Sequence, residues 1–99
     1  MIIIAGTIDL ADPSKMEEAI EKAKPLQQAT RDDEPGCHAY VFSQDPCVPG
    51  RIAVYELWED EASLAAHFHH QNYLNMRDLL GSIGLAGADA HLSFQRVQY

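Results

Sequence analysis

The fold of this chain is decided by the stretch Arg51-Ile-Ala-Val-Tyr-Glu-Leu-Trp58, which Glu59-Asp60-Glu61 follows at once. β-branched and aromatic residues make the first part a strand, and Asp60 is a suitable N-cap for a helix. Nine residues beyond the strand comes His67, in the string His67-Phe-His69-His70. A strand that ends in Glu-x-Trp and leads into a helix with a histidine brings a carboxylate, an indole and an imidazole together. This arrangement predicts a small-molecule pocket.

Periodicity along the rest of the chain predicts the remaining elements. Apolar residues at helical spacing follow Asp12-Pro13, where Asp12 is the expected N-cap, and Pro25 is expected to kink the helix. The expected order is a strand over residues 2–8, a helix over 13–30, a turn over 31–36, strands over 37–42 and 51–58, a helix after Asp60, a second helical segment through 73–83, and a strand over 88–99. The short helix after Asp60 is expected to bury Ala62, Leu64, Ala65 and Phe68.

The order βαββαβ is typical of a ferredoxin-like α+β fold, in which one antiparallel sheet carries its helices on one face. All 99 residues are expected to form one domain, because two smaller cores would be too small to be stable. Side chains alternate along a strand, so Glu56 and Trp58 share one face of the third strand, and Tyr55 and Leu57 share the other. Both faces carry apolar side chains. We therefore expect a second copy of the chain to cover the face without helices, giving a homodimer.

Charge and composition exclude several classes of partner. The formal net charge is -8, from 15 acidic and 7 basic residues, whereas nucleic acids and anionic membranes require basic patches. No apolar run is long enough to span a membrane, and the N-terminal segment lacks the basic start of a signal peptide. Cys37 and Cys47 have no metal-site spacing and fit a reducing compartment. We therefore expect a cytoplasmic protein that binds neither nucleic acid nor membrane.

Three segments together resemble the antibiotic biosynthesis monooxygenase family, within the dimeric α+β barrel superfamily. They are Glu34-Pro-Gly-Cys-His-Ala-Tyr40, Val54-Tyr-Glu-Leu-Trp58 and Glu61-Ala-Ser-Leu-Ala-Ala-His67. The resemblance implies a homodimer whose sheets pack into a barrel, with a pocket in each protomer between the helices and the sheet. It also implies cofactor-independent monooxygenation of an aromatic or quinol-like substrate by O₂.

Some relatives in this superfamily degrade haem, and they use an Asn on the first strand, a Trp at the end of the third and a His on the second helical segment. Trp58 occupies the second of these positions in this chain. Thr7 stands where the Asn is expected, and no His lies between Tyr73 and Ile83. Haem degradation is therefore not expected, and neither is any other cofactor.

His67 is the strongest candidate for a catalytic base, because an imidazole can accept a phenolic proton near neutral pH. Glu56 would be its partner or the partner of the substrate, and its pKa would rise if it lay in an apolar pocket. Trp58 would form a flat wall for an aromatic substrate. The alternatives are that His67 and Glu56 only hold the scaffold together and that Trp58 is simply a large core residue.

Further residues complete the expected site. His38 and Tyr40 share a face of the second strand, and Tyr73 lies near the expected pocket mouth; packing roles are the alternative for all three. Thr7 is included among the substrate-binding residues. His67 and His70 lie three apart on a helix, but a metal site needs a third ligand, and no second cluster with ligand spacing exists, so no metal is expected.

The sequence therefore predicts a small monooxygenase that oxidises an aromatic or quinol-like molecule with O₂. Two alternatives use the same pocket. One is a non-catalytic module that binds or senses a small apolar ligand, and the other is an isomerase or lyase that transfers protons without O₂.

Overall fold

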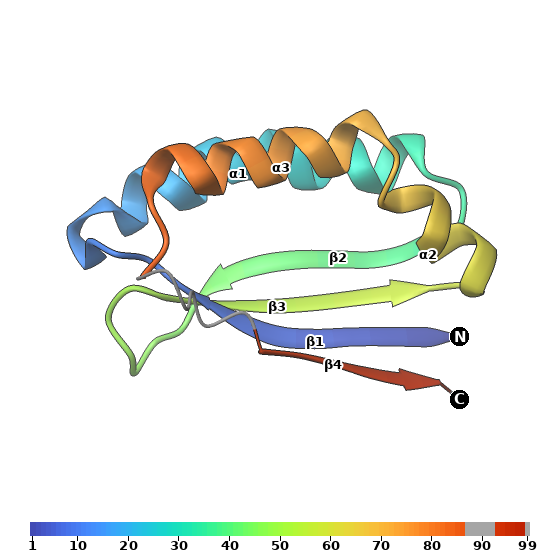
Figure 1. Ribbon diagram of the computed structural model, residues 1–99, viewed down its shortest axis with the longest axis horizontal. Coiled ribbons are helices and arrows are strands. Elements are labelled where there is room, and N and C mark those ends of the chain that lie inside the picture. Colours follow the sequence, from blue (N-terminus) through green and yellow to red (C-terminus); the bar gives the residue numbers. More distant parts are fainter. Residues whose placement is uncertain (87–92, 99) are drawn as a thin grey trace.

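A computed structural model describes residues 1–86 and 93–98 of the chain (Figure 1). The described residues form β1 (Ile2–Asp9), the short 3-10 helix η1 (Pro13–Lys15), α1 (Met16–Asp33), β2 (Cys37–Gln44), β3 (Arg51–Trp58), α2 (Glu61–His67), α3 (Gln71–Ile83) and β4 (Ser93–Gln98). Residues 88–92 and 99 of the predicted last strand lie outside the described residues. Within 1–86 and 93–98, no helix has both the length and the apolar composition that crossing a membrane requires.

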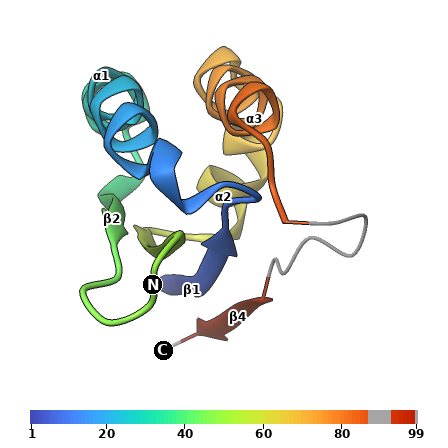
Figure 2. The ribbon, with the colours of Figure 1, turned by 90° about the vertical axis from the view of Figure 1, so that its left-hand side faces the viewer.

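The strands form one antiparallel sheet in the order β2-β3-β1-β4, and α1 and α3 lie side by side across one face of it (Figures 1 and 2). This is the ferredoxin-like arrangement, so the predicted fold class is confirmed. The register pairs Glu56 of β3 with Ile4 of β1 and with Tyr40 of β2. These three residues therefore form one row across the sheet, and this row becomes part of the candidate site.

Two of the helical segments begin at the N-caps that the sequence predicts. The Asp12 carboxylate accepts a hydrogen bond from the Ser14 backbone N–H at 3.0 Å, and the Asp60 carboxylate accepts one from the Ser63 backbone N–H at 2.8 Å. Each cap satisfies a backbone donor that has no partner within the first helical turn. The second cap fixes where α2 starts, immediately after β3.

The first long helix ends later than the sequence predicts. It continues through Pro25 and ends at Asp33, so residues 31–33, predicted as part of a turn, are its last turn. Glu34 is the C-cap, and its backbone N–H donates to the carbonyl of Thr30 at 3.2 Å. The extension places the side chain of Glu34 at the end of a rigid element.

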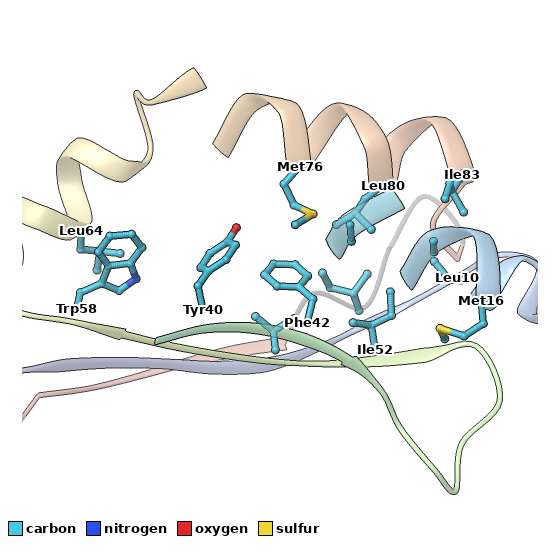
Figure 3. Close-up of a cluster of buried hydrophobic side chains, with 14 of the residues drawn as sticks. Leu10, Met16, Tyr40, Phe42, Ile52, Trp58, Leu64, Met76, Leu80 and Ile83 are labelled. Carbon is cyan, nitrogen blue, oxygen red and sulfur yellow. The ribbon is translucent and has the colours of Figure 1, made fainter. Parts of the chain in front are cut away.

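An apolar core fills the space between the sheet and the helices (Figure 3). Along β3, the even-numbered residues 52–58 are buried, whereas Tyr55 is 40% exposed. Alternation therefore assigns Glu56 and Trp58 to the face covered by helices and Tyr55 to the open face. The buried apolar residues are Ile2, Ile8, Leu10, Met16, Ala19, Ala23, Tyr40, Phe42, Ile52, Val54, Trp58, Leu64, Met76, Leu80 and Ile83.

The predicted buried face of α2 is wrong for most of its residues. Leu64 and His67 are buried, whereas Ala62, Ala65 and Phe68 are exposed. The helix has only seven residues and packs over the end of β3 through a single stripe at i and i+3. The histidine, and not the phenylalanine, therefore occupies the inward position of this stripe.

Candidate functional site

A cavity of about 400 Å³ lies between the helix-covered face of the sheet and α3. Its volume falls in the range of about 300–1,000 Å³ that is typical of small-molecule pockets. Aliphatic and aromatic side chains form most of the wall. The lining residues are Ile4, Ile8, Tyr40, Phe42, Glu56, His67, Phe68, Tyr73, Met76, Arg77, Leu80 and Leu85.

One lining residue of this cavity, His67, belongs to a buried pair of ionisable side chains. The Nδ1 atom of His67 is 2.8 Å from Oε1 of Glu34. His67 is 1% exposed and Glu34 is 7% exposed, so water does not compete for this hydrogen bond. α2 supplies the histidine from its last residue, and the C-cap of α1 supplies the carboxylate.

The position of Glu34 requires compensating donors, because a carboxylate at a helix C-terminus faces the negative end of the helix dipole. His67 is one donor. Asn72 is another, since its Nδ2 lies 3.2 Å from Oε2 of Glu34. Asn72 sits in the first turn of α3, where the positive end of that helix dipole favours a carboxylate. One carboxylate therefore joins the end of α1 to α2 and to the start of α3.

The hydrogen bond to Glu34 sets the tautomer of His67. A carboxylate can only accept, so Nδ1 carries the proton and the lone pair of the neutral ring lies on Nε2. Burial lowers the pKa of His67 below its ordinary value, although the hydrogen bond to Glu34 opposes this shift. His67 is therefore neutral at neutral pH. Such a ring is prepared to accept a proton at Nε2.

The Nε2 atom of His67 is available to a bound molecule. Among the described residues, the imidazole is hydrogen-bonded only through Nδ1. No side-chain nitrogen or oxygen within the described ranges is both sealed from solvent and without a partner. His67 lines the cavity, and Nδ1 is occupied by Glu34, so Nε2 is the ring nitrogen left for a bound molecule.

Glu56 and Trp58 form a second buried unit, which differs from the predicted one. The Trp58 Nε1–H donates to Oε1 of Glu56 at 3.0 Å. Burial raises the pKa of Glu56 to about 7, while the hydrogen bond from Trp58 acts against this rise. Glu56 lines the cavity, but the partner of His67 is Glu34, so of the two predicted roles of Glu56, partner of His67 or partner of the substrate, the first is wrong.

Trp58 lies beneath the site and outside the cavity lining. Its exposure is 0%, and it lies under Leu64 of α2 (Figure 3). The centroid of its ring is 4.5 Å from that of the His67 imidazole. The structure therefore places Trp58 as a support for His67 and as the donor to Glu56, and not as the wall that contacts a substrate.

Both tyrosines of the predicted site line the cavity. The ring of Tyr40 is 5.3 Å from the imidazole of His67, and the ring of Tyr73 is 5.4 Å from it, both in edge-on geometry. Figure 3 shows the Tyr40 hydroxyl pointing away from the sheet toward the helices. These two aromatic contacts restrict the rotation of the imidazole.

His38 and Thr7 lie outside the cavity, contrary to the predicted substrate-binding set. The pairing of β2 with β3 shifts between Cys37 and Ala39, so His38 is the extra residue of a β-bulge and does not share the face of Tyr40. Its side chain is 39% exposed. Thr7 pairs with Ala53 on the open face of the sheet. The register of β1 therefore turns Thr7 away from the site.

The other histidines of the string have different surroundings. His69 is exposed, as predicted. His70 is the N-cap of α3, where its Nδ1 accepts a hydrogen bond from the Asn72 backbone N–H at 3.0 Å. Within the described ranges, no three His, Cys, Asp or Glu side chains are grouped closely enough to hold a metal ion.

Sequence reasoning missed Glu34, Asn72 and Arg77 in this site. Glu34 is an acidic residue at the end of a helix, where the dipole disfavours it, and this mismatch is a signal that a buried partner holds it. Asn72 and Arg77 carry no comparable signal, because polar residues on a helix are usually solvated. Their roles follow only from the packing of α3 against the sheet.

The fold and the site together define a small α+β protein with a ligand cavity under its helices. The sequence profile of the antibiotic biosynthesis monooxygenase family matches residues 1–79. The chain therefore belongs to this family, and the predicted resemblance is confirmed.

Similar proteins of known structure share the whole fold. A crystal structure described as that of an antibiotic biosynthesis monooxygenase candidate from Caulobacter crescentus superposes with a TM-score of 0.85 at 21% identity, covering 99% of this chain and 88% of the other. A similarly described structure from Deinococcus radiodurans gives 0.81 at 23% identity, covering 100% and 92%. Identities this low establish the fold alone.

A sequence relative is an uncharacterised protein of Synechocystis sp., which is 34% identical over 67 residues. The match covers 68% of this chain but only 44% of that protein. This chain therefore spans less than half of the relative that it matches.

Proposed function

We propose that this protein is a monooxygenase that oxidises a small hydroquinone-like aromatic with O₂ and needs no bound cofactor. The observation that carries the proposal is the Glu34–His67 pair, which presents a neutral imidazole nitrogen to an apolar cavity. A proton acceptor in a water-poor cavity is what activates a phenolic substrate, because the phenolate is far more electron-rich than the phenol. Family membership supports the same reaction class.

His67 begins the proposed reaction by accepting the phenolic proton at Nε2. The Glu34 carboxylate stabilises the imidazolium that forms, since the hydrogen bond and the opposite charge both favour the protonated ring. The deprotonated substrate transfers one electron to O₂, and the two radicals combine to form a C–O bond at a ring carbon. The intermediate is a ring hydroperoxide.

The reaction is balanced without an external reductant. The O–O bond of the hydroperoxide breaks, the ring C–H proton is lost, and the distal oxygen leaves as water after taking up protons, one of them returned by His67. A hydroquinone and O₂ thus give a hydroxyquinone and water. All four electrons come from the substrate, and this accounts for chemistry without a flavin or a metal.

A second candidate function is proton transfer without O₂, as in an isomerase. The observation that favours it is Glu56, whose pKa is raised to about 7 by burial at the floor of the same cavity. A carboxylic acid and a neutral imidazole in one site can act as acid and base in turn. Turnover under strictly anaerobic conditions would support this candidate and contradict the monooxygenase proposal.

The test is oxygen uptake by the purified protein with a panel of hydroquinones. We expect uptake above the autoxidation rate, and we expect His67→Ala to reduce it by about 10²-fold or more, the usual contribution of a general base. His69→Ala removes an exposed neighbouring histidine and serves as the matched control. Ligand binding without turnover in the wild type would favour the non-catalytic module, and full activity in His67→Ala would reject the mechanism.

We also propose that the protein acts as a homodimer in the cytoplasm, with the open faces of two sheets packed together. Tyr55 on this face is 40% exposed and pairs with Ala5 and Val41 on the neighbouring strands, so the centre of the face is apolar. The free thiols of Cys37 and Cys47 suit a reducing compartment. Light scattering should give the mass of a dimer for the wild type and of a monomer for Tyr55→Asp, whereas Ala65→Asp on the outer side of α2 should leave the dimer intact.

A further inference from the structure

The cavity has one cationic side chain in its lining among the described residues, and this is Arg77 of α3. The side chain is 60% exposed, so its guanidinium lies at the mouth of the cavity. Its present partner is Asp78, whose Oδ1 accepts from Nε at 3.4 Å and from the terminal nitrogen at 3.3 Å. These are long contacts between exposed neighbours, and such pairs contribute little stability. The guanidinium is therefore free to exchange this partner for a ligand.

Arg77 and the proposed base line the same cavity. Tyr73 and Arg77 are four residues apart on α3 and both line the cavity, so they share one side of the helix. The ring of Tyr73 lies 5.4 Å from the imidazole of His67. Four residues of an α-helix rise about 6 Å, so Arg77 stands one helical turn beyond the end of the cavity that holds His67.

We propose that the substrate of this protein is an aromatic acid, with its carboxylate bound by Arg77 and its hydroxyl presented to Nε2 of His67. The inference rests on the proposed function and names the substrate class. A guanidinium binds a carboxylate through two parallel N–H···O bonds, and such a pair fixes orientation as well as adding affinity. The aliphatic walls between the two ends, including Met76 and Leu80, accommodate the ring.

The net charge of the protein sharpens this assignment. With a formal charge of -8, the chain as a whole repels anions. Arg77 is therefore the one cation of the described lining that can attract an anionic substituent, and a neutral aromatic would need no such group. The alternative is that Arg77 is only a solvated surface residue whose alkyl part packs on the rim.

The test measures the binding of two matched probes to four proteins by titration calorimetry. The probes are a dihydroxybenzoate and the corresponding dihydroxybenzamide, which differ in the charge of one substituent. Arg77→Met should weaken binding of the acid about tenfold or more, the usual effect of losing a charge-assisted hydrogen bond, and should change binding of the amide less than twofold. Asp78→Asn should strengthen binding of the acid, because it frees Arg77.

Lys24→Met is the control, since it removes one positive charge from the exposed side of α1 without touching the cavity. Equal losses for acid and amide in Arg77→Met, an equal loss in Lys24→Met, or no binding of either probe by the wild type would each overturn the inference. Acid-selective binding without oxygen uptake would reject the oxidation and keep the substrate class. Oxygen uptake with neutral hydroquinones but not with aromatic acids would reject the substrate class and keep the oxidation.

Discussion

The two faces of the sheet carry different kinds of side chain, although one strand contributes to both. On the helix-covered face, β3 presents Glu56 and Trp58, and His67 and Glu34 are buried above them. On the open face the same strand presents Tyr55 between apolar neighbours. Burial shifts the pKa values of Glu56 and His67 on the first face. The proposed chemistry and the proposed dimer contact therefore use opposite sides of one sheet, so variants of the two sides should have separable effects.

The largest expected effect on the helix-covered face is a change in the pH dependence of stability in Glu56→Gln. The pKa of Glu56 in the folded protein, about 7, lies above the ordinary glutamate value, so folding favours the protonated carboxyl, and the contribution of Glu56 to stability falls as the pH rises from about 4.5 through 7. The glutamine resembles the protonated form and keeps the acceptor for Trp58. It should therefore stabilise the protein above pH 7 by on the order of 3 kcal/mol, and not at all below about pH 4.5.

Denaturant unfolding of both proteins between pH 4 and 8 measures this difference. Glu21→Gln, which neutralises an exposed carboxylate on α1, should show no such dependence on pH. A difference between wild type and Glu56→Gln that is constant across the range would show that Glu56 does not titrate in the way its burial implies.

The next effect concerns turnover by Glu34→Gln. The amide oxygen can still accept from Nδ1 of His67, but the charge that stabilises the imidazolium is lost, so kcat should fall by about 10²-fold. Because Glu34 raises the pKa of His67, its removal should also move the acidic limb of the pH profile to lower pH. Asp32→Asn, an exposed change on the same helix, is the control. A lower kcat with an unmoved limb would indicate a purely structural role for Glu34.

A smaller effect is expected where α2 packs against the loop before β2. A Cβ added at Gly36 would overlap the side chain of Ser63 on α2, so Gly36→Ala should destabilise the protein by about 2 kcal/mol through overpacking. Gly81→Ala is the matched control, since nothing lies near its added Cβ, and it should stabilise α3 by up to about 1 kcal/mol. Thermal unfolding of the two variants measures these opposite changes in stability. Equal effects of both substitutions would mean that α2 adapts freely, and that His67 is less firmly placed than the packing indicates.

The smallest effect is expected for Thr7→Val on the open face. Thr7 is turned away from the cavity, so turnover should stay within about twofold and stability within about 0.5 kcal/mol of the wild type. Steady-state kinetics with the best hydroquinone provide the measurement. A loss of tenfold or more would show that the open face contributes to the site, and the separation of the two faces would then fail.

Most of the fold could be predicted because the signals are local. Alternation in residues 51–58, helical spacing after Asp12 and the caps at Asp12 and Asp60 all identify elements from a few neighbouring residues. The end of α1 was misplaced, since residues 31–33 look like a turn but continue the helix. The bulge at His38 was also missed, because an inserted residue leaves no trace in the alternation of β2 alone.

The site could be predicted less completely because its partners are distant in sequence. His67 and Tyr73 were identified as candidates from their neighbourhood, and both line the cavity. The carboxylate that meets His67 is Glu34, which lies 33 residues away. Reasoning from neighbouring residues favours Glu56, which is nearer to His67 in sequence and lies on the helix-covered face of the sheet. Only the packing of three helices decides between two acidic residues of this kind.

The carboxylate of Glu34 has a mechanical consequence as well as an electrostatic one. It ties the end of α1 to α2 through His67 and to α3 through Asn72. A ligand that hydrogen-bonds to Nε2 of this histidine therefore acts on a residue that connects three helices. Amide hydrogen exchange near the ends of these helices should slow together when the cavity is filled, so that occupancy of a small pocket is registered across the whole helical layer.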